Sequence, residues 1–347
     1  MNINRKVLYN PSGDDSDKRV VGGQPTNVFD LYNIKYKWAQ DIFSTMLSNH
    51  WVPEKSSMVE DKLSYTKLDE HEKESFLKIL SFLIFLDSIQ TNNVPNIAEY
   101  ITAPEIVLCL SRQTFDEALH SKSYGWILTS IFDRETAEKA IYYWREDKIL
   151  RTRNEYIANI YQKFLEGNTK DLKELVRVMV ANYLLEGLYF YNGFYFFYNL
   201  GSRGLMTDTV TQIKYINRDE LQHCLLFRNI LVTMFKENPG LQEECQDMVY
   251  EMVRIAVQQE IEFSNHVIGD RILGMNKQSI HDYTHYLANK RLVSLGYEPI
   301  MEKTKNPYKH LETLASVENE TTAKTNIFEK QSIAYKQATI LGGWDEI

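Results

Sequence analysis

The chain has 347 residues, of which 44% are hydrophobic, and it carries 39 Lys and Arg against 47 Asp and Glu, for a formal net charge of −8. This acidic balance argues against non-specific binding to nucleic acid, because neutralising phosphates needs clustered Lys and Arg. The three cysteines are scattered, and the N-terminus is polar and lacks an apolar signal segment, so we expect a cytoplasmic protein with reduced thiols and no membrane span.

Hydrophobic periodicity predicts an almost entirely helical chain, and 15 Gly with 8 Pro leave room for long helices. After an extended arm, helices are expected over residues 29–48, 68–93, 104–132, 135–166, 169–199, 206–236, 241–267 and 277–295. The 135–166 helix is charged and carries no ligand pattern, so we expect it on the outside. We therefore divide the chain into a flexible arm (1–26), a helical domain (27–310) and a flexible tail (311–347).

Two of the predicted helices carry a Glu-x-x-His motif, formed by Glu117 with His120 and by Glu220 with His223. Residues three apart share one face of a helix, so each pair can bind one metal ion. One such pair alone is often an ordinary exposed pair of side chains. Its repetition in two separate helices favours a metal site.

Asp87 and Glu186 lie alone in apolar helical runs, and each precedes a Glu-x-x-His motif by about 30 residues. A buried carboxylate without a partner is costly. A lone carboxylate followed by Glu-x-x-His, occurring twice, is typical of ferritin-like di-metal bundles. Four carboxylates balance two divalent ions, and ligands of this kind favour iron or manganese. The sequence thus predicts an all-α, ferritin-like helical bundle with additional outer helices.

An oxidisable side chain follows one of the motifs. Tyr124 lies one turn beyond His120, so its phenol is expected to point towards the metal pair. Three apolar residues lie within two turns of the predicted ligands: Phe190, Phe194 and Ile216. We expect them to face the same pocket and to shield an oxidised phenol from water, although they would be core residues in any case.

A family resemblance is carried by the runs LDSIQ, FDEALHSKSY, LLEGLYFYNGFYFF, IKYINRDELQH and NHWVPEK. They resemble the small, radical-generating subunit of class I ribonucleotide reductase over about residues 27–340. The resemblance implies a di-iron or di-manganese centre that reacts with dioxygen or a reduced oxygen species and oxidises Tyr124 to a tyrosyl radical. It implies that the metal ligands are Asp87, Glu117, His120, Glu186, Glu220 and His223.

The resemblance also implies an electron path and partners. Trp51 matches the tryptophan that leads from the metal site towards the surface, and Asp219 matches its hydrogen-bonded carboxylate. Tyr335 matches the tyrosine that passes the oxidising equivalent to the large subunit, which reduces ribonucleotides to deoxyribonucleotides. The C-terminal tail is expected to dock on that large subunit, and the chain itself is expected to form a homodimer.

Two other functions would use the same ligands. A ferritin-like iron-storage protein or oxidase needs neither Trp51 nor Tyr335 nor a large subunit. A di-metal oxygenase acting on a small molecule needs an open pocket, where the three apolar residues would instead close it. The metal stays open between iron and manganese, although Gly193 resembles the manganese-using subclass.

A second group of potential ligands lies in the predicted 277–295 helix, formed by His281, Asp282 and His285. Exposed His and Asp on a polar helix face usually contact only water. We therefore expect no metal function for this group.

Overall fold

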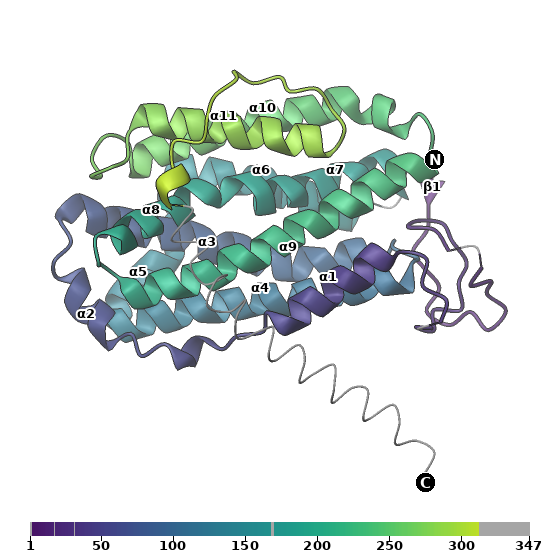
Figure 1. Cartoon of the computed structure of the whole chain (residues 1–347), viewed down its shortest axis with the longest axis horizontal. Coiled ribbons are helices and arrows are strands. Elements are labelled where there is room, and N and C mark those ends of the chain that lie inside the picture. The colour runs from purple at the N-terminus through teal and green to yellow at the C-terminus, as the bar shows by residue number, and fades with distance from the viewer. Residues whose placement is uncertain (1, 17, 31, 168–169, 312–347) are drawn as a thin grey trace, which may run out of the picture. The chain divides into compact units, whose positions relative to one another are not determined.

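Figure 1 shows the computed structural model of the chain, which describes residues 2–16, 18–30, 32–167 and 170–311. The described residues are mostly helical, with two strands of two residues each, which confirms the predicted all-α fold. The helices are α1 (Lys37–Ser48), α2 (Val59–Tyr65), α3 (Glu70–Ala98), α4 (Pro104–Ile131), α5 (Arg134–Tyr142), α6 (Lys148–Glu166), α7 (Leu172–Leu184), α8 (Tyr191–Ser202), α9 (Thr207–Glu237), α10 (Leu241–Val267) and α11 (Lys277–Ser294). The 3-10 turns are η1 (Pro53–Lys55) and η2 (Tyr143–Arg145), and η3 (Leu185–Tyr189) is a π-helical turn.

Contacts divide the chain into two units, Met1–Asn306 and Pro307–Ile347, and all of these helices belong to the first unit. The predicted docking tail, with its relay residue Tyr335, lies outside the described residues.

The centre of the first unit is the segment formed by α7, η3 and α8, in which every residue from 178 to 200 is buried. Around it, α3 packs along α4, and α9 packs against α4, α7 and α8. In Figure 1, α9 crosses the front of the bundle diagonally, and the paired helices α10 and α11 lie at the top. This arrangement brings α3, α4, η3 and α9 to one core, with α5, α6, α10 and α11 as further helices.

Helix α3 begins with a capping box and runs past a proline. The Asp69 side chain accepts a hydrogen bond from the Glu72 amide at 2.8 Å, and the Asp69 amide donates to Glu72 Oε2 at 3.1 Å. The helix was expected to end near residue 93, but it continues through Pro95 to Ala98. Val94 and Ile97 are fully buried on either side of the proline, so tertiary packing outweighs the local cost of proline.

Helix α1 begins at Lys37, eight residues later than predicted from the sequence. The amides of Lys35 and Tyr36 donate to Glu105 Oε1 on α4, at 3.0 and 3.1 Å. These amides are therefore used in a tertiary contact. The backbone just before residue 37 is not helical, and the donors of Lys35 and Tyr36 are satisfied by this carboxylate instead.

The single helix predicted over residues 135–166 is wrong, because two helices, α5 and α6, meet at η2. Each of the two has its own N-cap. The Asp133 side chain accepts from the Thr136 amide at 2.8 Å, and the Asp147 side chain accepts from the Leu150 amide at 2.9 Å. The short helix α2 was also not predicted.

The N-terminal arm has no helix in its described residues, as expected, but it forms a small antiparallel sheet. Strand β1 (Asn2–Ile3) pairs with β2 (Lys170–Asp171). Further along, the Thr102 amide donates to the Val20 carbonyl at 2.8 Å, and the Val20 amide donates to Glu237 Oε2 at 3.0 Å. The flexibility expected for residues 1–26 stays a prediction.

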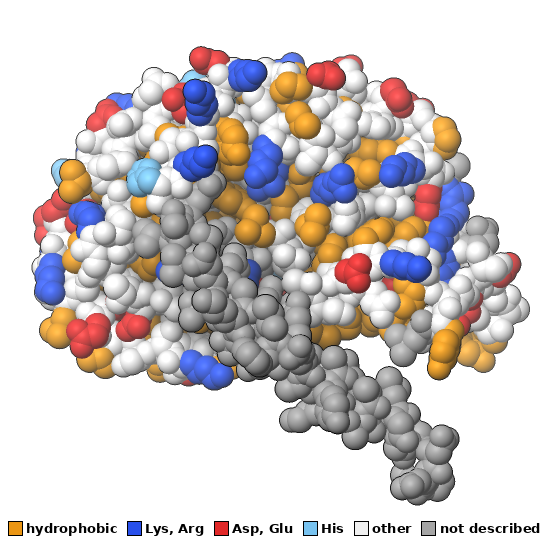
Figure 2. All heavy atoms as spheres, viewed as in Figure 1, with side chains coloured by type: hydrophobic (Ala, Val, Ile, Leu, Met, Phe, Trp, Pro, Cys, Tyr) orange, Lys and Arg blue, Asp and Glu red, His pale blue; other side chains and the backbone are white. Residues whose placement is uncertain are grey.

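Figure 2 shows one face of the molecule, on which acidic and basic side chains are interspersed. Hydrophobic side chains gather in a band across the middle of this face, around α9 and below α11. None of the described helices is both long and apolar enough to cross a membrane.

Candidate metal centre

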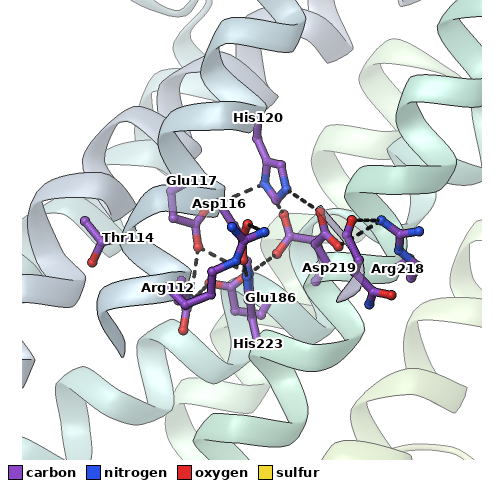
Figure 3. Close-up of polar contacts among 12 residues, drawn as sticks. Arg112, Thr114, Asp116, Glu117, His120, Glu186, Arg218, Asp219 and His223 are labelled. Carbon is purple, nitrogen blue, oxygen red and sulfur yellow. Dashed lines mark hydrogen bonds and ion pairs between the residues drawn. The ribbon is translucent and has the colours of Figure 1, made fainter. Parts of the chain in front are cut away.

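Four helical segments bring the six predicted ligands together in the core of the bundle. The side chains are fully buried and come from α3 (Asp87), α4 (Glu117, His120), η3 (Glu186) and α9 (Glu220, His223). In Figure 3 the labelled members of this set point towards one another from different helices. The structure therefore assembles all six residues that the sequence analysis selected.

The six side chains form two adjoining clusters that share Glu117 and Glu220. One cluster also contains Asp87 and His120, and the other also contains Glu186 and His223. In each cluster, one ligand atom of every residue lies within 4.8 Å of the others. His120 Nδ1 is 3.1 Å from Glu220 Oε1, and His223 Nδ1 is 3.3 Å from Glu117 Oε1. If two metal ions were bound, Glu117 and Glu220 would be available to both of them.

Many ligand atoms of these clusters have no hydrogen-bond partner. Among the described residues, no hydrogen bond of good geometry is found for Asp87 Oδ1 and Oδ2, Glu117 Oε2, His120 Nδ1, Glu186 Oε2 and Glu220 Oε1, although His120 Nδ1 and Glu220 Oε1 face each other. Buried polar atoms are normally paired, and each unpaired one costs about 1–3 kcal/mol. Cations would satisfy these atoms together. Carboxylate oxygens with one imidazole per cluster suit iron or manganese, so the residues present fit two such ions.

The charges of the centre also favour cations. Burial, followed by the charge of neighbouring carboxylates, raises the pKa of Asp87 and Glu186 well above the usual range. Burial also raises the pKa of Glu117 to about 7. Burial lowers the pKa of His120 and His223, but the surrounding carboxylates outweigh it and the net shift is upward. A cation that binds here therefore displaces protons.

Glu186 lies in the π-helical turn η3, which interrupts the helix predicted over residues 169–199. Two buried arginines bind carbonyls of this turn. Arg291 Nε donates to the Gly187 carbonyl at 2.8 Å, and Arg153 Nη2 donates to the Tyr189 carbonyl at 2.7 Å. A Cβ at position 187 would lie 2.6 Å from Arg291 Nε. The sequence analysis missed this support, although a glycine inside an apolar helical run was an available signal.

Three amide side chains surround the other oxygen of Glu186, and the sequence analysis missed them. Glu186 Oε1 accepts from Gln90 Nε2 at 2.6 Å, Gln113 Nε2 at 2.9 Å and Asn182 Nδ2 at 3.4 Å. Because these donors occupy Oε1, they leave Oε2 for the centre, where it lies 3.6 Å from His223 Nδ1. Each amide is three or four residues from a predicted ligand on its own helical segment. That spacing was the signal that could have found them.

A second carboxylate lies behind each imidazole. His120 Nε2 is 3.4 Å from Asp219 Oδ2, and His223 Nε2 is 3.5 Å from Asp116 Oδ2. Such a carboxylate holds the proton on Nε2 and turns Nδ1 towards the metal. Both aspartates directly precede the glutamate of a Glu-x-x-His motif, so the full repeat is Asp-Glu-x-x-His. The sequence analysis selected Asp219 but missed Asp116, which this repeat could have revealed.

The two sides of the centre differ beyond these aspartates, as Figure 3 shows for the arginines. Asp219 accepts a hydrogen bond from Trp51 Nε1 at 2.8 Å and lies 3.5 Å from Arg218 Nη2. Asp116 instead forms an ion pair with Arg112 Nη2 at 2.6 Å. A hydrogen-bonded series thus links His120, Asp219 and Trp51 on one side of the centre.

Tyr124 is fully buried on α4, and its hydroxyl makes no hydrogen bond of good geometry among the described residues, although Asp87 lies close enough to act on it. Burial raises the pKa of this phenol well above its usual value, and the negative charge of Asp87 raises it further. The phenol is therefore neutral, dry and under the direct electrostatic influence of one predicted ligand.

The three residues predicted to shield the phenol, Phe190, Phe194 and Ile216, are fully buried. The rings of Phe190 and Phe194 pack with their centroids 5.7 Å apart. Their contact with Tyr124 stays a prediction. Gly193 has a packing role, because a Cβ there would lie 3.0 Å from Ile79 Cγ2 on α3, so it carries no argument for manganese by itself.

Comparison of the sequence with known proteins shows the family to which the chain belongs. Residues 28–307 match the family model described as "Ribonucleotide reductase, small chain". The chain is 42% identical over 342 residues to a ribonucleoside-diphosphate reductase subunit beta of Treponema pallidum, with 98% of this chain and 97% of the relative covered. It is 34% identical over 347 residues to the protein of the same name in Halalkalibacterium halodurans, with 99% of each covered.

A solved structure resembles the whole bundle. The ribonucleotide reductase R2 subunit from Clostridium botulinum matches with a TM-score of 0.85 and 40% sequence identity. The match covers 91% of this chain and 99% of that one. This likeness confirms the ferritin-like architecture predicted from the doubled ligand pattern.

Proposed function

Since the chain belongs to the small-chain family of ribonucleotide reductases, we propose that its buried cluster generates an oxidising equivalent on Tyr124 for deoxyribonucleotide synthesis. Family membership makes the chain a subunit of a ribonucleoside-diphosphate reductase, which acts with a large subunit. It also leaves no support for an iron-storage protein or a small-molecule oxygenase.

One observation carries the proposal. Six fully buried carboxylate and imidazole side chains converge with unpartnered ligand atoms directed at one another. We propose that they hold two iron or two manganese ions. When bound, these ions supply redox chemistry with dioxygen or a reduced oxygen species, which neither carboxylates nor imidazoles can perform. Glu117 and Glu220 are the proposed bridging ligands.

Tyr124 is the proposed site of the radical. Oxidation of a phenol makes its proton strongly acidic, so a base must take the hydroxyl proton of Tyr124. Asp87 is the proposed acceptor, because its carboxylate lies close enough to the phenol to act on it through its charge and as a hydrogen-bond acceptor. Complete burial of Tyr124 excludes water and reductants from the oxidised ring.

The oxidising equivalent is proposed to leave through Trp51. The hydrogen bond from Trp51 to Asp219 and the contact of Asp219 with His120 support this route. Trp51 is 7% exposed, so the series begins at a metal ligand and ends close to the surface. Tyr335, in the tail that is proposed to dock on the large subunit, completes this route. We also propose that the chain forms a homodimer and acts in the cytoplasm.

The substitution Tyr124→Phe tests the proposal. It removes the oxidisable hydroxyl and leaves the six ligands unchanged. We expect two metal ions per chain by metal analysis, no organic radical by electron paramagnetic resonance after oxygen exposure, and loss of ribonucleotide reduction with the large subunit.

Tyr161→Phe is the matched control. Tyr161 is also a buried tyrosine whose hydroxyl has no hydrogen-bond partner among the described residues, and the charge of Glu186 also acts on it. This variant should keep the radical signal. An undiminished signal in Tyr124→Phe, or its loss in Tyr161→Phe alone, would refute the assignment of the radical to Tyr124.

A further inference from the structure

Two histidines lie one helical turn apart on α11, a helix that supplies no ligand to the buried centre. His281 and His285 are half-buried, and their ring centroids are 4.0 Å apart. Two histidines at positions i and i+4 on one helix face can bind the same metal ion. The sequence analysis expected these residues to contact only water, but the structure shows further contacts.

A third potential ligand, Glu302, comes from the segment that follows α11 and returns along it. Asn289 Nδ2 donates to the carbonyls of Met301 and Glu302 at 3.1 and 3.2 Å, and the Met301 amide donates to Asn289 Oδ1 at 3.0 Å. These bonds hold the backbone of residues 301 and 302 beside α11, and Glu302 Oε2 lies 4.0 Å from His281 Nε2. One ligand atom each of His281, His285 and Glu302 lies within 4.8 Å of the others.

Each of the two imidazoles has a ring nitrogen available to bind a metal ion. His281 Nδ1 lies 3.1 Å from Asp282 Oδ1, which also accepts from Gln278 Nε2 at 2.8 Å. A carboxylate at Nδ1 leaves the lone pair on Nε2, the nitrogen that faces Glu302. His285 Nδ1 is buried and has no hydrogen-bond partner among the described residues.

We propose that His281, His285 and Glu302 form a second metal site, which binds one zinc ion or a similar late first-row divalent cation. Two imidazoles and one carboxylate with a fourth position open to water are a common zinc ligand set. Imidazole suits zinc, nickel, copper and iron, whereas carboxylate oxygens suit manganese, so the proposed site favours manganese less than the oxygen-rich buried centre does.

The bound cation would connect α11 to the segment around Glu302. This segment precedes Asn306, the last residue of the first unit, after which the chain continues into residues 307–347. A metal ion bound by ligands from both elements restrains the segment in its place along the helix.

Zinc titration of the full-length chain tests the site. Calorimetry and metal analysis are performed on the wild type, His281→Ala and His285→Ala, with His71→Ala as a control because His71 is exposed on α3 outside any such group. We expect both α11 variants to bind one zinc ion fewer than the wild type. Asp282→Asn should weaken zinc binding on the order of 10–100-fold, and His71→Ala should have no effect.

Limited trypsin digestion gives a second readout. Lys303 and Lys305 are exposed cleavage sites next to Glu302. Zinc should slow cleavage at these two lysines in the wild type and in His71→Ala but leave it unchanged in His281→Ala and Glu302→Gln. Equal zinc stoichiometry in the wild type and both α11 variants, or equal protection by zinc in all proteins, would overturn the proposal.

Discussion

Two groups of buried charges contact the π-helical turn η3, and they are neutralised in different ways. The metal centre contains four carboxylates and two imidazoles, and many of its ligand atoms lack a partner among the described residues. The second group is an ion pair between Arg153 on α6 and Glu260 on α10, which are 2% and 1% exposed. Asn192 Nδ2 and Ser264 Oγ also donate to Glu260 Oε1, each at 3.0 Å.

The candidate metal centre and the Arg153–Glu260 pair are equally buried. They differ in charge balance, and this difference separates a ligand site from a structural ion pair. Arg153 brings one positive charge for the one negative charge of Glu260, and its guanidinium also lies over the Phe82 ring at 3.8 Å. The six side chains of the candidate centre include no arginine or lysine, and two imidazoles cannot balance four carboxylates, so the centre needs further protons or metal ions. This difference predicts how each group responds when one charge is removed.

The largest expected effect comes from removing the internal cation. Arg153→Leu leaves Glu260 buried without a counter-charge, and breaking such a pair costs about 3–5 kcal/mol. Chemical denaturation should show this loss in the free energy of unfolding. Arg153→Leu combined with Glu260→Leu should recover much of it, because no isolated charge remains. A single variant as stable as the wild type would show that the pair does not balance the charge.

Metal removal should give the second effect, with a defined dependence on pH. The pKa of Glu117 rises from 4.5 to about 7 on burial, so the folded metal-free protein binds this proton more tightly than the unfolded chain. The stabilisation of the folded state by this bound proton is fully present below pH about 4.5 and is lost as the pH rises through about 7. We expect metal-free protein to lose on the order of 1–3 kcal/mol between pH 5 and 8.

Metal-loaded protein is the control for this measurement. The ion pair between Arg153 and Glu260 is the same in the metal-free and the metal-loaded protein, so it contributes equally to both. Bound cations replace the protons, so unfolding followed by circular dichroism should not show the same decline in stability. Metal-free protein that becomes more stable over this pH range would contradict the direction of the Glu117 shift.

A smaller effect should follow from the aspartate that the sequence analysis missed. Asp116→Asn removes the carboxylate behind His223, and the loss of such a partner lowers metal affinity on the order of 10–100-fold. Equilibrium dialysis with manganese measures it. Unchanged affinity would mean that Asp116 serves only its ion pair with Arg112.

The smallest effect is expected in the internally balanced network. Ser264→Ala removes one of several donors to Glu260 and should cost about 1 kcal/mol in the free energy of unfolding. Metal content should stay at the wild-type value, because Ser264 has no contact with the centre. Loss of metal in this variant would show that the two groups are coupled through η3.

The spacing of residues along the predicted helices was sufficient to predict most residues of the candidate site. Glu117 and His120 share a helix face because three residues make almost one turn, and the same holds for Glu220 and His223. The doubled order of carboxylate and motif predicted a ferritin-like bundle with a di-metal site, and the structure confirms the bundle and the convergence of the six side chains. Asp116 and the amides at Gln90, Gln113 and Asn182 were within reach of the same reasoning.

Partners that are distant in the sequence required the tertiary structure. The start of α1 depends on Glu105, and the π-turn around Glu186 is supported by Arg153 and Arg291, which lie on other helices. Likewise, Glu302 meets His281 only because the chain turns back along α11. The sequence alone determined which side chains share a helix face, because helix geometry is local. Which faces meet was decided by packing of the whole bundle, since apolar faces must interlock at high density and most buried polar groups find their partners there.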